Sequence, residues 1–244
     1  MERPLFPVQG MLDIHSHLLP GVDDGCASLK DSMECARRMV AAGYTESFCT
    51  PHFWPSYPKT TRESIPRWVE TLQRELEANA IPLKLYPGSE ISLRPNLMEG
   101  DVRLLPTFGM AGKYALIDLW ADRMPTFFEP TIRWMQAAGM TVILAHPERM
   151  RAVQEDPALA DYFAELGVLL QGNLQCFNDR PDAAPRITVE RFIAEDRYFF
   201  LGSDLHNPES LNMRLRGLNR AIELAGISRV QKLTVENPRI LLTQ

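Results

Sequence analysis

The chain has 244 residues, of which 45% are hydrophobic and 23% are charged, and its formal net charge is −5 with a pI near 5.6. This length and composition are typical of one globular unit, and we expect a single domain over residues 1–244. The acidic balance argues against a nucleic-acid partner, because phosphate backbones select a basic surface.

Short apolar runs alternate along the chain with longer amphipathic segments. We predict strands at residues 11–14, 47–50, 83–86, 115–119, 141–144, 168–171 and 199–201, and helices at 28–42, 61–79, 126–138, 156–166, 188–195 and 208–226. Ser28 or Asp31 is suited to cap the first helix, and Gly43 follows its end. A short terminal helix is expected at 235–242, with Asn237 and Pro238 in its first turn.

Strands that are apolar throughout and separated by helices are typical of a parallel sheet buried on both faces. Seven such units favour a barrel of the (β/α) type, slightly small for eight repeats. The competing fold is an open doubly wound sheet. It is disfavoured because no glycine-rich nucleotide-binding loop follows any of the predicted strands.

The cysteines exclude one class of enzyme and indicate a compartment. Cys26, Cys35, Cys49 and Cys176 form no CxxC pair, which is typical of a reducing compartment. No Arg stands six positions after any of them, so the phosphate-binding loop of a thiol-based tyrosine phosphatase is absent. No apolar run approaches the roughly 18 residues of a membrane span, and MERPLFPVQG does not resemble a signal peptide. We therefore expect a cytoplasmic protein without membrane insertion.

Polar side chains gather at the ends of the predicted strands. Each of the five histidines lies at or just past such an end, and carboxylates or an amide occupy the ends of other strands. In a (β/α) barrel these ends converge on one face, where the loops build an active site. The residues concerned are His15, His17, His52, Glu90, Asp118, His146, Asn173, Asp204 and His206.

This joint pattern predicts a metal cluster. A single histidine at a strand end is more often a hydrogen-bonded core residue than a ligand, but His15 and His17 stand two apart and so share one side of a strand. Imidazole and carboxylate together suit Zn²⁺, Mn²⁺ or Fe. The candidates exceed the need of one ion, which predicts two or three. Adjacent ions about 3.5–4 Å apart can hold a bridging hydroxide for an in-line displacement, and Glu90 is the best-placed bridging acid.

Other polar and aromatic residues are candidates for substrate contacts. Arg149, in AHPER, is either a phosphate-binding residue or a surface charge. Asp23 and Asp24, in GVDDG, are candidates for ligands, for a general acid or for turn residues. Trp54 and Tyr57, in HFWPSYP, are suited either to stacking on an aromatic substrate or to folding their loop onto the barrel.

The motifs MLDIHSHLLPGVDDG, CTPH, GSEI, ALIDL, LAHPERM and GSDLHN, in this order, resemble the polymerase-and-histidinol-phosphatase (PHP) superfamily. Within it, the chain is similar to bacterial manganese-dependent protein-tyrosine phosphatases of capsule and exopolysaccharide operons. The likeness runs from Asp13 to about Asn237. It implies an α/β fold, a distorted TIM-like (β/α)7 barrel, with three metal ions, manganese favoured over iron and zinc. The implied substrate is a phosphotyrosine protein, a bacterial tyrosine kinase of polysaccharide biosynthesis and export.

Transferred position by position, the resemblance implies a bridging role for Glu90 and phosphate binding by Arg149; with Asp24, these are the expected catalytic residues. The family usually has Glu where this chain has Asp118, and the shorter side chain would shift one ion or admit a water. Relatives place an Arg soon after SDxHN, whereas the first here is Arg214. The implied metal ligands are His15, His17, Asp24, His52, Glu90, Asp118, His146, Asp204 and His206.

Several alternatives stay open. The same site would suit a small phosphomonoester such as histidinol phosphate or, against the acidic charge, a nucleic-acid phosphodiester. A metal-dependent amidohydrolase also begins with His-x-His, but many of these bridge their metals with a carbamylated Lys, and no lysine here stands at a strand end. A non-catalytic regulatory scaffold is disfavoured because no ligand position is empty. The pattern makes no prediction of oligomeric state.

Overall fold

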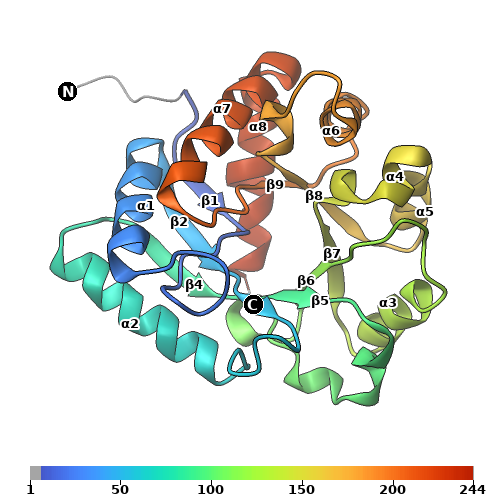
Figure 1. Ribbon diagram of the computed structural model, residues 1–244, viewed down its shortest axis with the longest axis horizontal. Helices are drawn as coiled ribbons and strands as arrows, with labels where there is room; N and C mark the ends of the chain where they lie inside the picture. The colour runs from blue at the N-terminus through green and yellow to red at the C-terminus, as the bar shows by residue number, and fades with distance from the viewer. Residues whose placement is uncertain (1–6, 244) are drawn as a thin grey trace.

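All strand pairing in the computed structural model, which describes residues 7–243, is parallel. One sheet has the order β1-β2-β4 and the other the order β3-β5-β6-β7-β8-β9. Figure 1 shows the helices around the outside of these strands. The strands are β1 (Met11–Asp13), β2 (Tyr44–Cys49), β3 (His52–Phe53), β4 (Lys84–Pro87), β5 (Glu90–Ser92), β6 (Tyr114–Asp118), β7 (Thr141–Ala145), β8 (Leu169–Asn173) and β9 (Phe200–Gly202).

The two sheets form one series of seven strand segments. β3 follows β2 after a two-residue break, and β5 follows β4 in the same way. The ends of the series meet beyond β1 and β9, where Ser16 forms a parallel bridge with Leu205 and the amide of Asp204 donates to the carbonyl of His15 at 2.8 Å. The predicted α/β fold with parallel strands in one domain is therefore confirmed, and a single bridge with its flanking hydrogen bonds joins the two ends.

The main helices are close to their predicted positions, and Ser28 caps α1 by accepting a hydrogen bond from the amide of Asp31. Gly43, which follows α1, has a φ of 102°, a value that favours glycine. Among residues 7–243, no helix is both long and apolar enough to cross a membrane. The helices are α1 (Leu29–Ala41), α2 (Ser64–Ala78), α3 (Phe128–Ala137), α4 (Arg151–Glu155), α5 (Leu159–Glu165), α6 (Ala184–Ala194), α7 (Pro208–Ala225) and α8 (Ile227–Gln231).

The structure differs from the sequence prediction in several places, and the short helices α4 and α8 were not predicted. β3 and β5 are additional short strands, and they contain His52 and Glu90 themselves. The helix expected at 188–195 begins earlier, at Ala184, because Pro185 occupies its first turn. The short terminal helix expected at 235–242 is present, with Asn237 and Pro238 in its first turn, but it is a 3₁₀ helix, η7 (Asn237–Leu241), that follows a π-helical turn (Lys232–Glu236). Residues 1–6 and 244 lie outside the described residues. They include both ends of the predicted domain and the first part of the N-terminal segment that was judged not to be a signal peptide.

A small apolar cluster contains side chains from strands throughout the series, and it is separate from the larger core that the helices cover. Leu12, Phe48, Leu116 and Phe200 are each at most 1% exposed within it. Leu241 of η7 packs against the same cluster. Complete burial of such side chains contributes roughly 1.5–3 kcal/mol each. This packing fixes the strands whose carboxyl ends carry the polar residues.

Candidate metal centre

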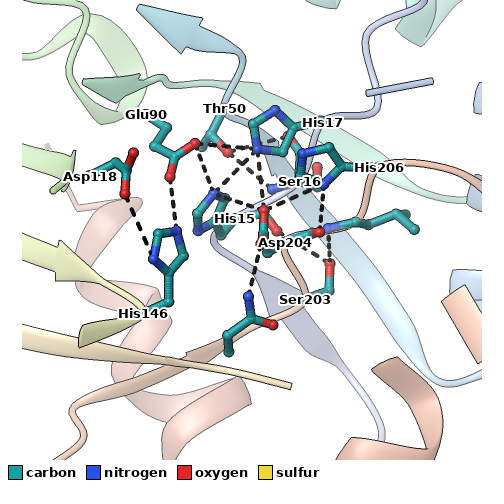
Figure 2. Close-up of polar contacts among 12 residues, drawn as sticks. His15, Ser16, His17, Thr50, Glu90, Asp118, His146, Ser203, Asp204 and His206 are labelled. Carbon is teal, nitrogen blue, oxygen red and sulfur yellow. Dashed lines mark hydrogen bonds and ion pairs between the residues drawn. The ribbon is translucent and has the colours of Figure 1, made fainter. Parts of the chain in front are cut away.

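The nine predicted ligands gather at the carboxyl ends of the strands, and each has at least one other member of the set within 4 Å. Figure 2 labels all of them except Asp24 and His52. The sequence argument expected this convergence from parallel strands alone. The predicted ligands are His15 and His17 after β1, Asp24 in the next loop, His52 in β3, Glu90 in β5, Asp118 at the end of β6, His146 after β7, and Asp204 and His206 after β9.

Glu90 lies at the middle of the cluster, with four imidazoles around its carboxylate. Its Oε2 is 2.7 Å from Nδ1 of His52 and 3.5 Å from Nε2 of both His15 and His17. Its Oε1 is 3.0 Å from Nε2 of His146. A carboxylate with both oxygens facing separate histidines has the arrangement expected of a bridging ligand.

Two further carboxylates complete the ligand groups. Oδ1 of Asp204 is 3.5 Å from Nε2 of His15 and 3.4 Å from Nε2 of His17. Oδ1 of Asp24 is 3.1 Å from Nε2 of His52 and 3.7 Å from Nε2 of His206. Three groups result, each with its donor atoms within 4.8 Å of one another: His17, Asp24, His52 and His206; His15, Glu90 and His146; His15, His17 and Asp204.

Three buried polar atoms show that the cluster fits metal ions. Nδ1 of His52, Oε2 of Glu90 and Oδ1 of Asp118 are buried without a hydrogen-bond partner. The first two lie 2.7 Å apart, yet they are not aligned for a hydrogen bond. A buried polar group without a partner costs about 1–3 kcal/mol, and a shared cation would remove that cost. A mixed set of imidazoles and carboxylates suits Mn²⁺, Fe or Zn²⁺.

The charges of the cluster are strongly coupled. Burial, together with the nearby charge of Glu90, raises the pKa of Asp118 to about 6. Burial alone would lower the pKa of His52, but its contacts with Asp24 and Glu90 raise that pKa to about 9. These shifts show a site in which negative charge is held at close quarters, an arrangement that a bound cation would stabilise.

Asp23 and Gln171 each contact the second ring nitrogen of a histidine in the cluster. Oδ2 of Asp23 is 2.7 Å from Nδ1 of His17, and Oε1 of Gln171 is 2.9 Å from Nδ1 of His15. Such contacts to the second ring nitrogen fix the tautomer and orientation of a metal-ligating histidine. The sequence argument left Asp23 open between several roles and did not single out Gln171, whose only signal was its position near the end of a predicted strand.

A cavity of about 250 Å³ opens above the cluster. Arg149 lines it and donates from Nη1 to Oδ2 of Asp204 at 2.9 Å, with 30% of its side chain exposed. Trp54 also lines the cavity, with its ring centroid 3.9 Å from that of His52. Trp120, which was not among the residues predicted from the sequence, lines the cavity as well. Tyr57, a candidate for substrate stacking, instead stacks on His52 with 5.8 Å between ring centroids.

Comparison with known proteins agrees with this geometry. A family model described as "Capsular polysaccharide synthesis, CpsB/CapC" matches residues 11–243. The chain is 29% identical to the tyrosine-protein phosphatase YwqE of Bacillus subtilis, over 95% of this chain and 91% of that protein. It is 24% identical to the tyrosine-protein phosphatase CpsB of Streptococcus agalactiae, over 95% of this chain and 98% of that protein.

A solved structure is also similar along the whole chain. It belongs to a report described as "Crystal structures of YwqE from Bacillus subtilis and CpsB from Streptococcus pneumoniae, unique metal-dependent tyrosine phosphatases". The superposition has a TM-score of 0.86 at 28% identity and covers 96% of this chain and 94% of the other.

Proposed function

The chain belongs to the CpsB/CapC family of capsular polysaccharide synthesis, and from this membership we propose that it is a metal-dependent phosphatase that hydrolyses phosphotyrosine in proteins. Its relatives YwqE and CpsB are named tyrosine-protein phosphatases. The observation that carries the proposal is the cluster around Glu90, in which three buried polar atoms lack hydrogen-bond partners and would be satisfied by a bound cation.

We assign the nine clustered residues as ligands of two or three divalent ions, with manganese favoured and iron or zinc as alternatives. His15, Glu90 and His146 form one ligand group, and His17 with Asp204 belongs to a neighbouring one. Bound divalent ions would supply Lewis-acid stabilisation of the phosphoryl group and activation of water at neutral pH.

The protein's own side chains bind and orient the substrate. Arg149 contacts Asp204 through Nη1. Because the Arg149 side chain is partly exposed at the cavity, its other guanidinium N–H groups are free to donate to phosphate oxygens. Asp24, with 54% of its side chain exposed, faces His52 and His206, which favours the ligand role over that of a general acid. A tyrosine leaving oxygen has a pKa of about 10 and needs less protonation than an alkoxide would.

The proposed protein substrate is a tyrosine kinase of polysaccharide biosynthesis or export, and the proposed location is the cytoplasm. The family's description and the names of the relatives support the substrate class. The four cysteines are all free and buried, which fits a reducing compartment.

The proposal is tested by elemental analysis of the purified protein together with turnover of three substrates: a phosphotyrosyl peptide, a phosphoseryl peptide and histidinol phosphate. We expect the highest kcat/KM for the phosphotyrosyl peptide, with activity lost on chelation and restored by Mn²⁺. A higher kcat/KM for histidinol phosphate would contradict the proposed substrate. Binding of a phosphotyrosine protein without cleavage by the Mn²⁺-loaded protein would instead support the scaffold alternative.

The variant Glu90→Gln tests the cluster directly, because it keeps the shape of the side chain and removes its charge. We expect loss of both bound metal and turnover. Asp182→Asn is the matched control, since it removes the charge of an exposed carboxylate whose ion-pair partner is Arg180. Wild-type metal content in the Glu90 variant would contradict the assignment.

A further inference from the structure

Trp120 presents its ring to solvent at the mouth of the cavity. Trp120 is 59% exposed, the largest exposed fraction of any large apolar residue within residues 7–243. It also lines the cavity of the metal centre, two positions after Asp118 at the end of β6. A large exposed aromatic side chain next to a polar site is typical of a surface that contacts a ligand.

The ring lies beside the groups to which phosphate binding is assigned. The guanidinium carbon of Arg149 is 4.6 Å from the centroid of the Trp120 ring, a cation–π contact. The ring of His146 is 6.3 Å away between centroids. Trp54 lines the same cavity from the loop after β3, and its indole Nε1 is buried without a hydrogen-bond partner. The cavity thus has indole rings in its wall as well as charged groups.

We propose that Trp120 is a specificity-determining residue that contacts the aryl ring of the phosphorylated side chain and thereby favours aryl over alkyl phosphomonoesters. This inference rests on the proposed function, since it takes the phosphate to be held by the metal centre and Arg149. With the phosphate so bound, the group attached to its leaving oxygen extends toward the mouth, where the Trp120 ring is open. A phenyl ring packs there against the indole, whereas a phosphoserine side chain offers no ring to pack.

A competing role for Trp120 is to hold the Arg149 guanidinium in place. In that case the loss of the indole would weaken every phosphomonoester alike, because all of them use the same phosphate contact. The ratio of kcat/KM between an aryl and an alkyl phosphate separates the two roles. Only a direct contact with the aryl ring changes that ratio.

The test compares Trp120→Ala and Trp120→Phe with the wild type, each loaded with Mn²⁺, on phosphotyrosyl and phosphoseryl peptides of one sequence. Trp120→Ala is expected to lower kcat/KM for the phosphotyrosyl peptide roughly three- to tenfold, with a much smaller effect on the phosphoseryl peptide. Trp120→Phe is expected to keep most of the preference. Ile187→Ala is the matched control, because Ile187 is 57% exposed on α6 and its truncation is expected to leave both values unchanged.

Binding of phosphonates provides a measurement that does not depend on turnover. We expect the wild type to bind phenylphosphonate more tightly than methylphosphonate by calorimetry, and Trp120→Ala to lose this preference while keeping its metal content and melting temperature. An unchanged preference in the variant, or an equal loss for both peptides, would overturn the inference. A wild type that cleaves neither peptide would contradict the proposed phosphatase instead, and the phosphonate comparison would still decide the role of Trp120.

Discussion

The variant Asp23→Asn tests whether the carboxylate behind His17 controls the metal affinity of the centre. Oδ2 of Asp23 lies 2.7 Å from Nδ1 of His17 and accepts a hydrogen bond from the amide of His52 at 3.0 Å. Oδ1 accepts another from the amide of Gly25 at 3.0 Å. Asparagine has the same shape, but it is neutral and turns an NH₂ group toward one of these donors. The substitution therefore removes the charge that orients His17 and leaves the space filled.

The magnitude follows from the role of Asp23 in orienting His17. Burial alone would raise the pKa of Asp23, but the contact with His17 lowers it from 3.8 to about 2, so the buried carboxylate is charged where it faces the ring. Loss of a residue that orients a ligating histidine typically weakens metal binding by about 10- to 100-fold. Asp23→Asn is therefore expected to weaken Mn²⁺ binding by about 10- to 100-fold.

The assay is a titration of Mn²⁺ against a competing fluorescent chelator. Glu34→Gln is the matched control, because Glu34 is an exposed carboxylate whose ion-pair contact, with Arg37, is 4.0 Å long. Saturating Mn²⁺ is expected to restore turnover of Asp23→Asn, because Asp23 orients a ligand and does not touch the substrate. Wild-type affinity in Asp23→Asn would refute the reasoning, and so would a loss of turnover that saturating Mn²⁺ does not restore.

Three further predictions follow from other contacts. His15→Ala is expected to abolish turnover and lower the metal content measured by elemental analysis; retained turnover would contradict the cluster. Arg149→Ala should weaken inhibition by inorganic phosphate at least about tenfold without loss of metal, with Arg149→Lys intermediate, because a hydrogen bond to a charged group is lost; an unchanged inhibition constant would make Arg149 a surface charge. Gly217→Ala should destabilise the protein by about 3 kcal/mol or more in urea unfolding, because its Cβ would lie 1.7 Å from the carbonyl oxygen of Leu174. Gly100→Ala, whose Cβ would meet its nearest atom at 3.5 Å, is the control and should change stability little.

The seven predicted strand segments were recognisable because most of them carry short, mainly apolar runs. The two additional strands were not, since β3 and β5 have two and three residues and are too short for any periodicity. Pro51 and Gly88 interrupt the segments just before them. The conformation of the C-terminal segment also depends on tertiary packing, because Leu241 reaches the small apolar cluster only when the strands are already in place.

The convergence of the nine predicted ligands was predictable for a topological reason, since the carboxyl ends of parallel strands lie at one face of the fold. The residues that orient them were not. Gln171 contacts His15 across 156 positions of the chain, and nothing local to either residue indicates the pairing. The position of Trp120 at the cavity was not predictable either, because an aromatic residue after a strand is as suitable for packing as for contacting a ligand. Its exposure and its contact with Arg149 exist only in three dimensions.

Two of the clustered residues adopt the left-handed backbone conformation, which favours glycine. His146 has a φ of 34° and Asp204 a φ of 51°, and each such non-glycine position costs about 1–3 kcal/mol. Hydrogen bonds from the strands maintain both: the amide of His146 donates to the carbonyl of Gln171, and that of Asp204 to the carbonyl of His15, each at 2.8 Å.

Arg214 reinforces the second of these turns. Its guanidinium lines the cavity, but it donates to main-chain carbonyls, including that of Asp204 from Nη2 at 2.7 Å and that of Ser203 from Nε at 3.1 Å. Arg214, the first arginine after the SDxHN motif, thus fixes the strained turn that contains the predicted ligand Asp204. Because the left-handed turns lie directly after β7 and β9, they bring the side chains of His146 and Asp204 back over the strand ends. The strained backbone therefore directs two predicted ligands toward the cluster. The hydrogen bonds to Gln171 and His15 offset its conformational cost.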